Sequence, residues 1–525
     1  MHGTTAWPLI RAARIWPGDE AIVDGAARVT YGELYARVAA LGGGLDRCGI
    51  EAGEVVSVLA DNSASHLEAW LGVPSHGRVI NDLNVRLAEA ELAFMIDDCG
   101  ATALIVDDSH LDVGRSLLDR CPSVQTLIYM GGGSPPPGMT TWERLVSGEP
   151  VAFPDLAADT LAAIVYTGGT SGRSKGVMLS HGNLLANAKQ YTIAIKHLRS
   201  DRYLHVLPMF HVADTSQTYA LTWAGGTHVI LPSFQPAAVA RTIERERITL
   251  LQLVPTTIAM LLDDPTSDEC DLSSLRLLFY AASPMPAALQ RRAMKRLECE
   301  FSQMYGMTEA APLVSHCSAE DHRRGAAGEQ PYADRLASAG APIVGVQVEI
   351  HDPVTGEPMP DGTPGEIWVR GPNVMLGYWN LPNETAAALT ADGWYRSGDV
   401  AYADRYGYLY IVDRVKDMIV SGGENIYSTE VELALYEYPG VREVAVFGVP
   451  DPKWGERVHA IVVMEDGRDA TANQLIAHSR SLIAGYKTPR AVEFRTDPLP
   501  KSAAGKILKR EVRDAYWALE SRQVS

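Results

Sequence analysis

The chain has 525 residues, of which 46% are hydrophobic and 21% charged, a globular composition with enough apolar residues for more than one core. Its 46 Lys and Arg against 64 Asp and Glu give a net charge of −18, so nonspecific binding to nucleic acid is not expected. Six cysteines occur without a CxxC pair, which argues against a disulfide scaffold or zinc ribbon and favours a cytoplasmic protein. The sequence has no apolar run long enough to predict a transmembrane segment.

The first 400 residues read as alternating helices and strands. Thr30 and Glu33 have the spacing of a capping box, and apolar residues recur behind them at helical intervals. Short apolar runs follow and predict strands at residues 55–59, 103–106, 161–166, 228–231 and 275–280. A helix is predicted at residues 286–297. Buried strands alternating with helices predict an α/β fold with parallel sheets covered on both faces.

The pattern of predicted helices and strands changes after about residue 412. Thr429 with Glu432 has the spacing of another capping box, and Thr471 with Gln474 that of a third. Strands are predicted between these helices at residues 443–449 and 458–464. This part predicts a compact α+β unit with its own core.

A glycine-rich segment at residues 166–176 follows a predicted strand directly and reads Tyr-Thr-Gly-Gly-Thr-Ser-Gly-Arg-Ser-Lys-Gly. Glycines let backbone N–H groups point inward, while hydroxyls and a lysine add donors and positive charge, which suits a polyphosphate. The spacing between Gly172 and Lys175 differs from that of a Walker A loop, so a P-loop NTPase is disfavoured.

Further motifs follow this loop at residues 303–309 (Gln-Met-Tyr-Gly-Met-Thr-Glu), 394–399 (Trp-Tyr-Arg-Ser-Gly-Asp), 413–417, 421–426 and 500–506. With these motifs in this order, nearly the whole chain resembles the adenylate-forming enzymes, and within them most closely the fatty-acyl and aryl-CoA ligases. The resemblance implies a large N-terminal domain at 1–412, made of stacked α/β sheets with a β-barrel-like subdomain. It also implies a hinge at 413–417 and a small mobile α+β C-terminal domain at 418–525.

The resemblance implies an ATP-dependent carboxylic acid–CoA ligase, in which a fatty or aryl carboxylate is activated as acyl-AMP with release of pyrophosphate and the CoA thiol then takes the acyl group. ATP, Mg²⁺ and CoA are the implied cofactors and co-substrate. Thr308 would bind phosphate and Glu309 would hold Mg²⁺, for which a carboxylate is a suitable ligand. The residues implied in nucleotide binding are Thr167, Gly168, Gly169, Thr170, Ser171, Gly172, Lys175, Ser283, Pro284, Tyr305, Gly306, Thr308, Asp399 and Arg414.

Lys506 corresponds to the family's catalytic lysine, whose ammonium would bridge the carboxylate and the α-phosphate and stabilise charge in the transition state. Its neighbours Lys501 and Lys509 are interpreted as surface charges. Lys416 matches the hinge position, about which the small domain would rotate after the first step. That rotation would bring in a channel for the thiol or another acceptor, formed by Gly422, Gly423 and Glu424.

His211 matches a histidine that lies beside the carboxylate in relatives, and it is a candidate catalytic residue. Asp214 is unexpected in a pocket for a plain alkyl chain, so it either faces solvent or reads a donor group on the acid. Met304 stands where relatives often carry glycine and would shorten or narrow the pocket. The predicted walls of the acid pocket are His211, Asp214, Ser216, Trp223, Ala281 and Met304.

Several alternatives stay open at this stage. An amide bond synthetase would use the same adenylate with an amine acceptor and would keep every ATP motif. A non-catalytic nucleotide sensor of the same fold is a further alternative, and an adenylation domain feeding a carrier protein is another. The sequence names neither the acid nor the oligomeric state, and a homodimer is among the states left open.

Overall fold

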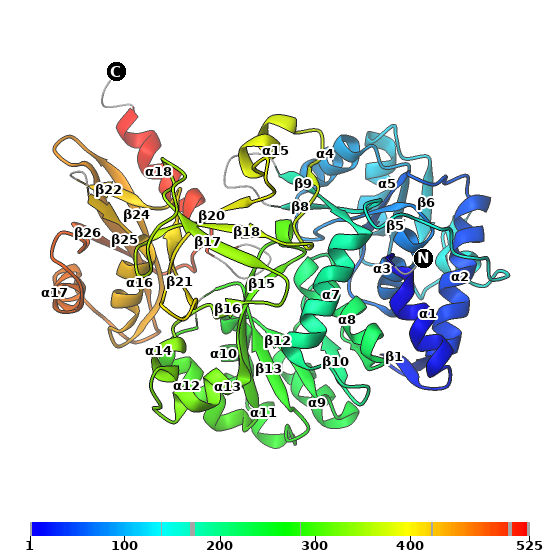
Figure 1. Ribbon diagram of the computed structural model, residues 1–525, viewed down its shortest axis with the longest axis horizontal. Helices are drawn as coiled ribbons and strands as arrows, with labels where there is room; N and C mark the ends of the chain where they lie inside the picture. The colour runs from blue at the N-terminus through cyan, green and yellow to red at the C-terminus, as the bar shows by residue number, and fades with distance from the viewer. Residues whose placement is uncertain are drawn as a thin grey trace.

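The larger part of the molecule is built on two stacked sheets. The structure, a computed structural model, describes residues 3–137, 139–167, 174–283, 285–421, 424–501 and 507–521. Within these residues the strands form four sheets, two in the larger part, one beside them and one in the C-terminal unit (Figure 1).

The first large sheet has the order β16-β15-β14-β13-β12-β10-β11-β1-β2 within the described chain. The pairs from β14 to β1 are parallel, and the pairs at both ends are antiparallel. Its strands are β1 (Glu20–Asp24), β2 (Ala27–Thr30), β10 (Arg202–His205), β11 (Thr227–Ile230), β12 (Leu250–Leu253), β13 (Leu277–Tyr280), β14 (Glu300–Gly306), β15 (Leu313–Cys317) and β16 (Ala341–Pro342).

The second large sheet has the order β19-β9-β8-β4-β3-β5-β6-β7. Its β8–β9 pair is antiparallel and brings Thr167 opposite Lys175. The glycine-rich segment therefore connects two antiparallel strands. The strands are β3 (Val55–Leu59), β4 (Val79–Asp82), β5 (Ala103–Val106), β6 (Thr126–Tyr129), β7 (Thr140–Thr141), β8 (Leu161–Thr167), β9 (Lys175–Ser180) and β19 (Gly377–Tyr378).

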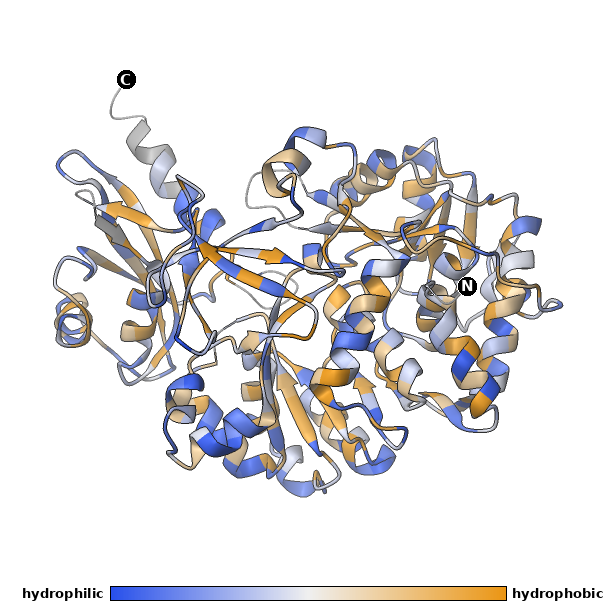
Figure 2. Cartoon of the chain, viewed as in Figure 1, coloured by the Kyte–Doolittle hydropathy of each residue, from blue (hydrophilic) through white to orange (hydrophobic). Residues whose placement is uncertain are grey.

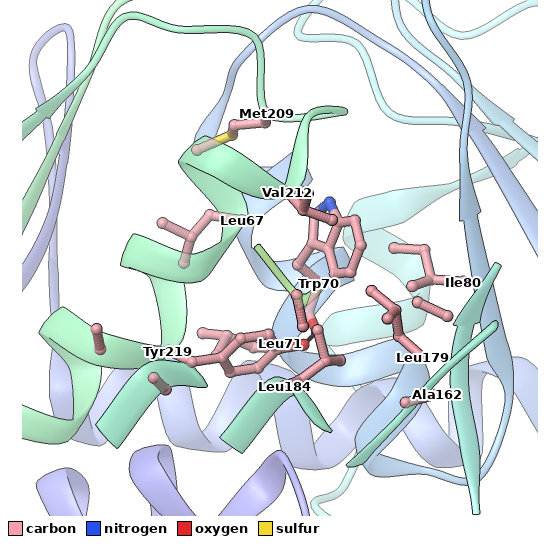
Figure 3. Close-up of a cluster of buried hydrophobic side chains, with 14 of the residues drawn as sticks. Leu67, Trp70, Leu71, Ile80, Ala162, Leu179, Leu184, Met209, Val212 and Tyr219 are labelled. Carbon is pink, nitrogen blue, oxygen red and sulfur yellow. Dashed lines mark hydrogen bonds between the residues drawn. The ribbon is translucent and has the colours of Figure 1, made fainter. Parts of the chain in front are cut away.

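Helices lie between the two sheets and on their outer faces. The shared core joins residues of both sheets with residues of the inner helices α1 (Ala6–Ile15), α2 (Tyr31–Arg47), α3 (Ala64–Ser75), α7 (His181–Ile195) and α8 (Val212–Ala224). Figure 3 shows this packing, with Trp70 of α3, Leu184 of α7 and Tyr219 of α8 pointing toward one another. Apolar strands run through the interior while the outer helices carry more polar residues (Figure 2).

The outer helices build two further cores. Residues of α9 (Pro236–Glu246), α10 (Pro255–Asp263) and α12 (Ala287–Leu297) pack on the outer face of the first sheet, and those of α4 (Glu89–Cys99) and α5 (Leu111–Arg120) on that of the second. The shorter helices are α6 (Trp142–Val146), α11 (Thr266–Glu269), α13 (Ala319–Ala326), α14 (Tyr332–Arg335), α15 (Pro382–Ala388) and the 3₁₀ turn η1 (Thr308–Ala310). Parallel sheets covered on both faces confirm the predicted α/β class.

A third, antiparallel sheet has the order β17-β18-β20-β21 and lies beside the two large ones, in the region where the β-barrel-like subdomain is expected. Its strands are β17 (Gln347–His351), β18 (Gly365–Arg370), β20 (Tyr395–Ala403) and β21 (Leu409–Arg414). The β20–β21 pairing places Asp399 opposite Arg414, so this sheet joins two of the predicted nucleotide-binding residues.

The C-terminal unit has its own sheet, β23-β22-β25-β24 with β26 beside β25, and its own cores on the two faces of that sheet. Its strands are β22 (Ile419–Ser421), β23 (Glu424–Ile426), β24 (Val441–Asp451), β25 (Gly455–Met464) and β26 (Ala491–Arg495). Its helices are α16 (Ser428–Tyr436), α17 (Ala472–Leu482) and α18 (Lys509–Ser521). Strand β21 extends to Arg414, two residues into the predicted hinge.

The capping-box predictions differ in outcome. Thr30 with Glu33 and Thr471 with Gln474 both form the reciprocal hydrogen bonds of a capping box. The prediction for Thr429 with Glu432 is wrong, because α16 begins at Ser428 with Tyr427 as its N-cap residue, so Thr429 lies inside the helix. The Glu432 carboxylate instead accepts from the backbone N–H of Val446 at 2.8 Å and so joins α16 to β24.

No helix in the described part of the chain is both long and apolar enough to cross a bilayer.

Candidate active site

Tyr305, Asp399 and Arg414 form one polar cluster at the junction of the first and third sheets. The Tyr305 hydroxyl donates to Asp399 Oδ2 at 2.7 Å, and Arg414 Nε lies 3.2 Å from Asp399 Oδ1 in an ion pair. Burial, together with the charge of Asp399, holds the pKa of the Tyr305 hydroxyl well above its usual value. Tyr305 therefore stays protonated. The Asp399 carboxylate lies between the Tyr305 hydroxyl and the Arg414 guanidinium and can accept further hydrogen bonds.

Local backbone geometry fixes Asp399 in place. Gly398 has φ +72°, a left-handed conformation that favours glycine, and its N–H donates to Glu366 Oε1 at 3.1 Å. The Asp399 N–H donates to Ser397 Oγ at 3.1 Å. The Gly-Asp turn that the sequence marks is thus a constrained bend within β20.

Glu309, Tyr378 and Lys175 form a second cluster next to the first. The Tyr378 hydroxyl donates to Glu309 Oε1 at 3.0 Å, and Lys175 Nζ lies 4.9 Å from the centre of the Tyr378 ring in a cation–π contact. Burial raises the pKa of the Glu309 carboxyl, with Asp399 adding to the shift. A buried carboxylate with a neighbouring lysine can hold a cation and an anionic ligand at one site. Tyr378 was not among the predicted site residues.

Two residues close in sequence to predicted site residues have left-handed backbone conformations. Ala282, next to the predicted adenine-lining Ser283, has φ +75°, and Ala311, at the end of the turn that carries Thr308 and Glu309, has φ +58°. A non-glycine residue in this region costs free energy that the surrounding structure must offset, and such residues occur often at functional sites. Gly306 is needed for space, because a Cβ there would lie 2.0 Å from the Pro312 carbonyl oxygen.

Lys416 extends the positive charge beside these clusters. Burial lowers the pKa of its ammonium, and the charges of Lys175 and Arg414 lower it further. The structure therefore brings the predicted hinge lysine within electrostatic reach of two predicted nucleotide-binding residues. The neighbouring cations Lys175, Arg414 and Lys416 together suit a ligand that carries several negative charges.

Part of the predicted site is not covered by these observations. Gly168, Gly169, Thr170, Ser171, Gly172, Pro284, Gly422, Gly423 and Lys506 lie outside the described residues, and of Glu424 only the backbone, in β23, is described.

His211 stands at the start of α8, where it is the N-cap residue. Its Nε2 is buried without a hydrogen-bond partner in the described part of the chain. Burial lowers the pKa of the ring to about 4, with Arg86 adding to the shift, so His211 is neutral at pH 7. Ala281 follows β13, and Tyr305 lies near the end of β14. The carboxyl ends of such parallel strands are where ligands bind in α/β sheets.

Asp214 does not fulfil either expectation for it. Its side chain is fully buried, so it does not face solvent. Its oxygens accept from the Tyr203 hydroxyl at 2.9 Å and contact His205 Nδ1 at 2.6 Å. His205 in turn contacts His228, which reaches Thr222. The carboxylate is therefore occupied inside the protein, where it fastens α8 to the first sheet, and is not a reader of the substrate.

The other predicted pocket walls divide into two groups. Met304 is 2% exposed on β14, and Ser216 is buried in α8 with its hydroxyl 3.2 Å from the Ala213 carbonyl oxygen. Trp223 lies near the far end of α8, where Lys189 stacks on its ring and Arg11 binds its carbonyl. With a rise of about 1.5 Å per residue, it stands about 18 Å from His211 along the helix axis. The role of Trp223 as a wall of the acid pocket stays a prediction.

Lys509 is also corrected, because it is not a surface charge. Its Nζ donates to Ser428 Oγ at 2.6 Å and pairs with Glu432 Oε1 at 2.8 Å, and its side chain is 18% exposed. The Ser428 N–H and hydroxyl both donate to Asp413 at the end of β21. This chain of contacts ties α16 and α18 to the strand that carries Arg414.

Sequence comparison gives an independent view of the chain. It matches the AMP-binding enzyme family over residues 9–379 and the AMP-binding enzyme C-terminal domain over residues 430–506. Feruloyl-CoA synthase from an Amycolatopsis species is 41% identical over 98% of this chain and 99% of its own. Indoleacetate–CoA ligase from Aromatoleum aromaticum is 36% identical over 96% of both chains.

Solved structures agree with the sequence relatives. The amide bond synthetase McbA from Marinactinospora thermotolerans superposes with a TM-score of 0.87 at 31% identity, over 98% of this chain and 99% of that one. The two family matches cover the large part and the C-terminal unit, and the first of them includes the cluster around Glu309. The cluster around Asp399 lies between the two matches, within the stretch aligned with the relatives. The chain belongs to the AMP-binding enzyme family.

Proposed function

We propose that this protein is an ATP-dependent carboxylic acid–CoA ligase that acts on an aromatic acid. One observation carries the proposal: a chain that matches feruloyl-CoA synthase over 98% of its length also brings Lys175, Glu309, Asp399 and Arg414 together at one place. An oxygen of the acid attacks the α-phosphorus of ATP and pyrophosphate leaves. The CoA sulfur then attacks the acyl carbon and AMP leaves.

The nucleotide is held by the two clusters. Asp399 accepts the ribose hydroxyls, with Arg414 beside it, and Tyr305 covers the base. Lys175 and Thr308 bind the phosphates, together with the hydroxyls and N–H groups of residues 167–172. Because both reactants are anions, these positive charges offset the repulsion that opposes their approach.

Mg²⁺ fits the chemistry of Glu309. This ion keeps several waters and takes one or two carboxylates together with phosphate oxygens. Glu309 is a buried carboxylate that accepts a hydrogen bond from the neutral Tyr378 hydroxyl, which leaves acceptor capacity for a hard cation. When bound there, Mg²⁺ would supply positive charge to the pyrophosphate leaving group.

Lys506 and the C-terminal unit complete the site. We assign to Lys506 the contact that bridges the carboxylate and the α-phosphate, and to His211 the wall beside the carboxylate. The C-terminal unit at 418–525 rotates about Lys416 after adenylation, which exchanges Lys506 for the segment of Gly422, Gly423 and Glu424. CoA then enters along that segment. The protein is assigned to the cytoplasm, where ATP and CoA are available.

An aromatic acid is favoured over a fatty acid for two reasons. Met304 is buried on the strand beside the one that Ala281 follows, and its side chain would take up space that a long alkyl chain needs. Two relatives of nearly full coverage are named for aromatic acids. An amide synthetase, in which an amine captures the adenylate, is a second candidate that the superposition with McbA favours.

A panel of acids in a pyrophosphate-release assay, run with and without CoA, tests the proposal. Aromatic acids should release pyrophosphate, and free thiol should disappear only when acid, ATP and CoA are all present. Amide formation from an added amine without loss of thiol would select the second candidate. Acid-independent pyrophosphate release, or none with any acid, would reject both.

A further inference from the structure

Strand β20 bulges away from its neighbour β18 at the residues that lead to Asp399. Trp368 of β18 pairs with Arg396, and Glu366 of β18 pairs with Val400. Between these two pairs β20 has three residues, 397–399, where β18 has one. A bulge of this kind bends the strand and changes the direction of its side chains, and such bulges occur often beside active sites. It also takes backbone groups out of the ladder, so they need other partners.

The Glu366 carboxylate supplies a partner for the bulge and spans it from side to side. The residue is 6% exposed. Its Oε1 accepts from the Gly398 N–H at 3.1 Å, within the bulge. Its Oε2 accepts from Trp368 Nε1 at 3.0 Å and from Arg396 Nε at 3.2 Å. The charge of Arg396 offsets the cost of burying the carboxylate, and both oxygens are used to join β18 to β20.

The bulge is also held from its other side. The Gly398 carbonyl oxygen accepts from the Val415 N–H at 2.9 Å, one residue beyond Arg414. Gly398 is thus bound through both of its backbone groups, by the Glu366 side chain on β18 and by the backbone that follows β21. Because Gly398 has φ +72°, the direction in which Asp399 leaves the bulge depends on this peptide.

Asp399 carries the result of this arrangement into the site. Its carboxylate lies between the Tyr305 hydroxyl, at 2.7 Å, and Arg414 Nε, at 3.2 Å. Glu366 bonds instead to the backbone that precedes Asp399. A displacement of about 1 Å in a residue that holds a substrate can lower the rate roughly a hundredfold. The bonds that fix the bulge therefore bear on how well Asp399 meets a ligand.

We propose that Glu366 is a positioning residue for recognition of the ribose, and that it acts by holding the bulge at residues 397–399 in the form that aims Asp399 at the two ribose hydroxyls. This inference rests on the proposed function, in which Asp399 accepts those hydroxyls. Glu366 itself touches neither nucleotide nor acid. Its removal should weaken the hold on the ribose and leave the phosphates and the reacting atoms in place.

Glu366→Gln tests the proposal with a side chain of nearly the same shape. An amide has one acceptor oxygen, and its NH₂ group can only donate. It can therefore accept from Gly398, or from Trp368 and Arg396, but it cannot keep both sets of bonds. Glu366→Asp is a second variant, which retains the charge opposite Arg396 but is too short to keep the bond to Gly398 as well.

The measurement compares ATP with 2′,3′-dideoxyATP, which lacks both ribose hydroxyls, by kcat/KM for acid-dependent pyrophosphate release. The parent should prefer ATP by roughly a hundredfold or more, the effect of two hydrogen bonds to a charged group, and each variant should lower that preference roughly tenfold. The loss should appear as a higher KM for ATP, with kcat close to that of the parent and the kinetics of the dideoxynucleotide unchanged. The ratio does not depend on how much of a preparation is folded, because both nucleotides meet the same enzyme.

Glu349→Gln is the matched control, because it makes the same substitution in the same sheet. Glu349 lies on β17, its side chain is 49% exposed, and its Oε2 lies 2.9 Å from His351 Nε2. It should leave the preference for ATP as in the parent. Glu366 variants that keep the parent preference would overturn the inference. An equal loss of kcat/KM with both nucleotides would also overturn it, because Glu366 would then support the fold and not the ribose contact.

Two results with the parent separate this inference from the proposed function. A parent that releases pyrophosphate in response to an acid, but does not distinguish ATP from the dideoxynucleotide, overturns the inference and leaves the ligase activity standing. A parent that releases no pyrophosphate with any acid overturns the proposed function itself.

Discussion

Tyr378 donates its hydroxyl to Glu309 at 3.0 Å, and its ring meanwhile lies 4.9 Å below the ammonium of Lys175. One side chain thus touches both the carboxylate proposed to hold Mg²⁺ and the cation proposed to hold phosphate. Glycine at position 377, with φ +144°, and the N–H of Tyr378, which donates to Thr385 Oγ1 at 2.9 Å, fix the direction of this side chain.

Tyr378→Phe should reduce kcat/KM for ATP by roughly tenfold, because it removes one hydrogen bond to a charged group and keeps the ring under Lys175. Tyr378→Leu should reduce it further, because the cation–π contact is lost as well. Pyrophosphate release at several Mg²⁺ concentrations measures both variants. Tyr410→Phe, in a stacked pair with Tyr402, is the control. Equal ATP kinetics for Tyr378→Phe and the parent would remove Tyr378 from the site.

Met304→Gly should extend the range of accepted acids toward longer or bulkier ones. Met304 is buried on the face of β14 that looks toward α7 and α8, so its removal opens space in the proposed acid pocket. The cavity should also lower stability by about 2 to 5 kcal/mol, as with other large-to-small core changes. The measurement is pyrophosphate release over a series of acids of increasing length, alongside thermal unfolding. The same acid profile in both proteins would show that Met304 is not a wall of that pocket.

The sequence predicted the fold well where the pattern was local. Strands at 55–59 and 103–106 and the cap at Thr30 depend only on apolar runs and on hydroxyl–carboxylate spacing, and they are found as predicted. The third sheet was less visible, because half-exposed antiparallel strands alternate in polarity and give no continuous apolar run. Asp214 shows the same limit at the site, since its partners Tyr203 and His205 lie on another element.

Residues without a recognisable motif were not predicted. Tyr378 belongs to a two-residue strand, and only its contacts reveal a role.

Lys509→Met should destabilise the C-terminal unit by about 3 kcal/mol, because it leaves the buried Glu432 carboxylate without its cation. Lys487→Met is the matched control, since Lys487 pairs with Glu430, whose side chain is 33% exposed, and pairs open to solvent contribute about 0 to 1 kcal/mol. Thermal and urea unfolding of both variants measure the difference. If both lysines shift the unfolding midpoint equally, Lys509 is not the buried anchor described above.

Lowering the pH should reduce the free energy of unfolding, because buried histidines are neutral in the native state and take up protons on unfolding. Burial lowers the pKa of His181 to about 4, while an unfolded histidine titrates near 6.5. Between these values the unfolded state binds a proton that the native state does not, so stability falls as pH falls, by about 1.4 kcal/mol per pH unit for one such group. Burial lowers the pKa of His322 in the same direction, also to about 4.

His181→Asn removes one of these groups and should flatten the dependence of the unfolding free energy on pH between about 6.5 and 4. Urea unfolding of parent and variant at pH 5 and pH 7, at equal ionic strength, gives the two slopes. The raised pKa values of the buried carboxyls Glu309 and Glu432 change stability with pH in the opposite direction. Their contribution is the same in parent and variant, so it cancels in the difference between the two slopes. Identical slopes would mean that His181 is not held neutral by burial.

Lys506→Ala should nearly abolish adenylate formation while ATP affinity stays close to that of the parent. The reason is that the ammonium is proposed to act on charge that develops during the transfer, which lowers kcat rather than binding of the nucleotide. Single-turnover pyrophosphate release and equilibrium ATP binding separate the two effects. Lys501→Ala, a few residues away, should leave both close to the parent. Equal pyrophosphate release by Lys506→Ala and the parent would reject the role.

The central claim is that an acid becomes an adenylate and is then passed to CoA at the same site. The most direct measurement follows AMP, pyrophosphate and thioester together after an aromatic acid, ATP, Mg²⁺ and CoA are added to the purified protein. The account predicts equal amounts of all three products, and acyl-AMP retained on the enzyme when CoA is left out. Formation of AMP and pyrophosphate with no thioester, or thioester without AMP, would contradict it.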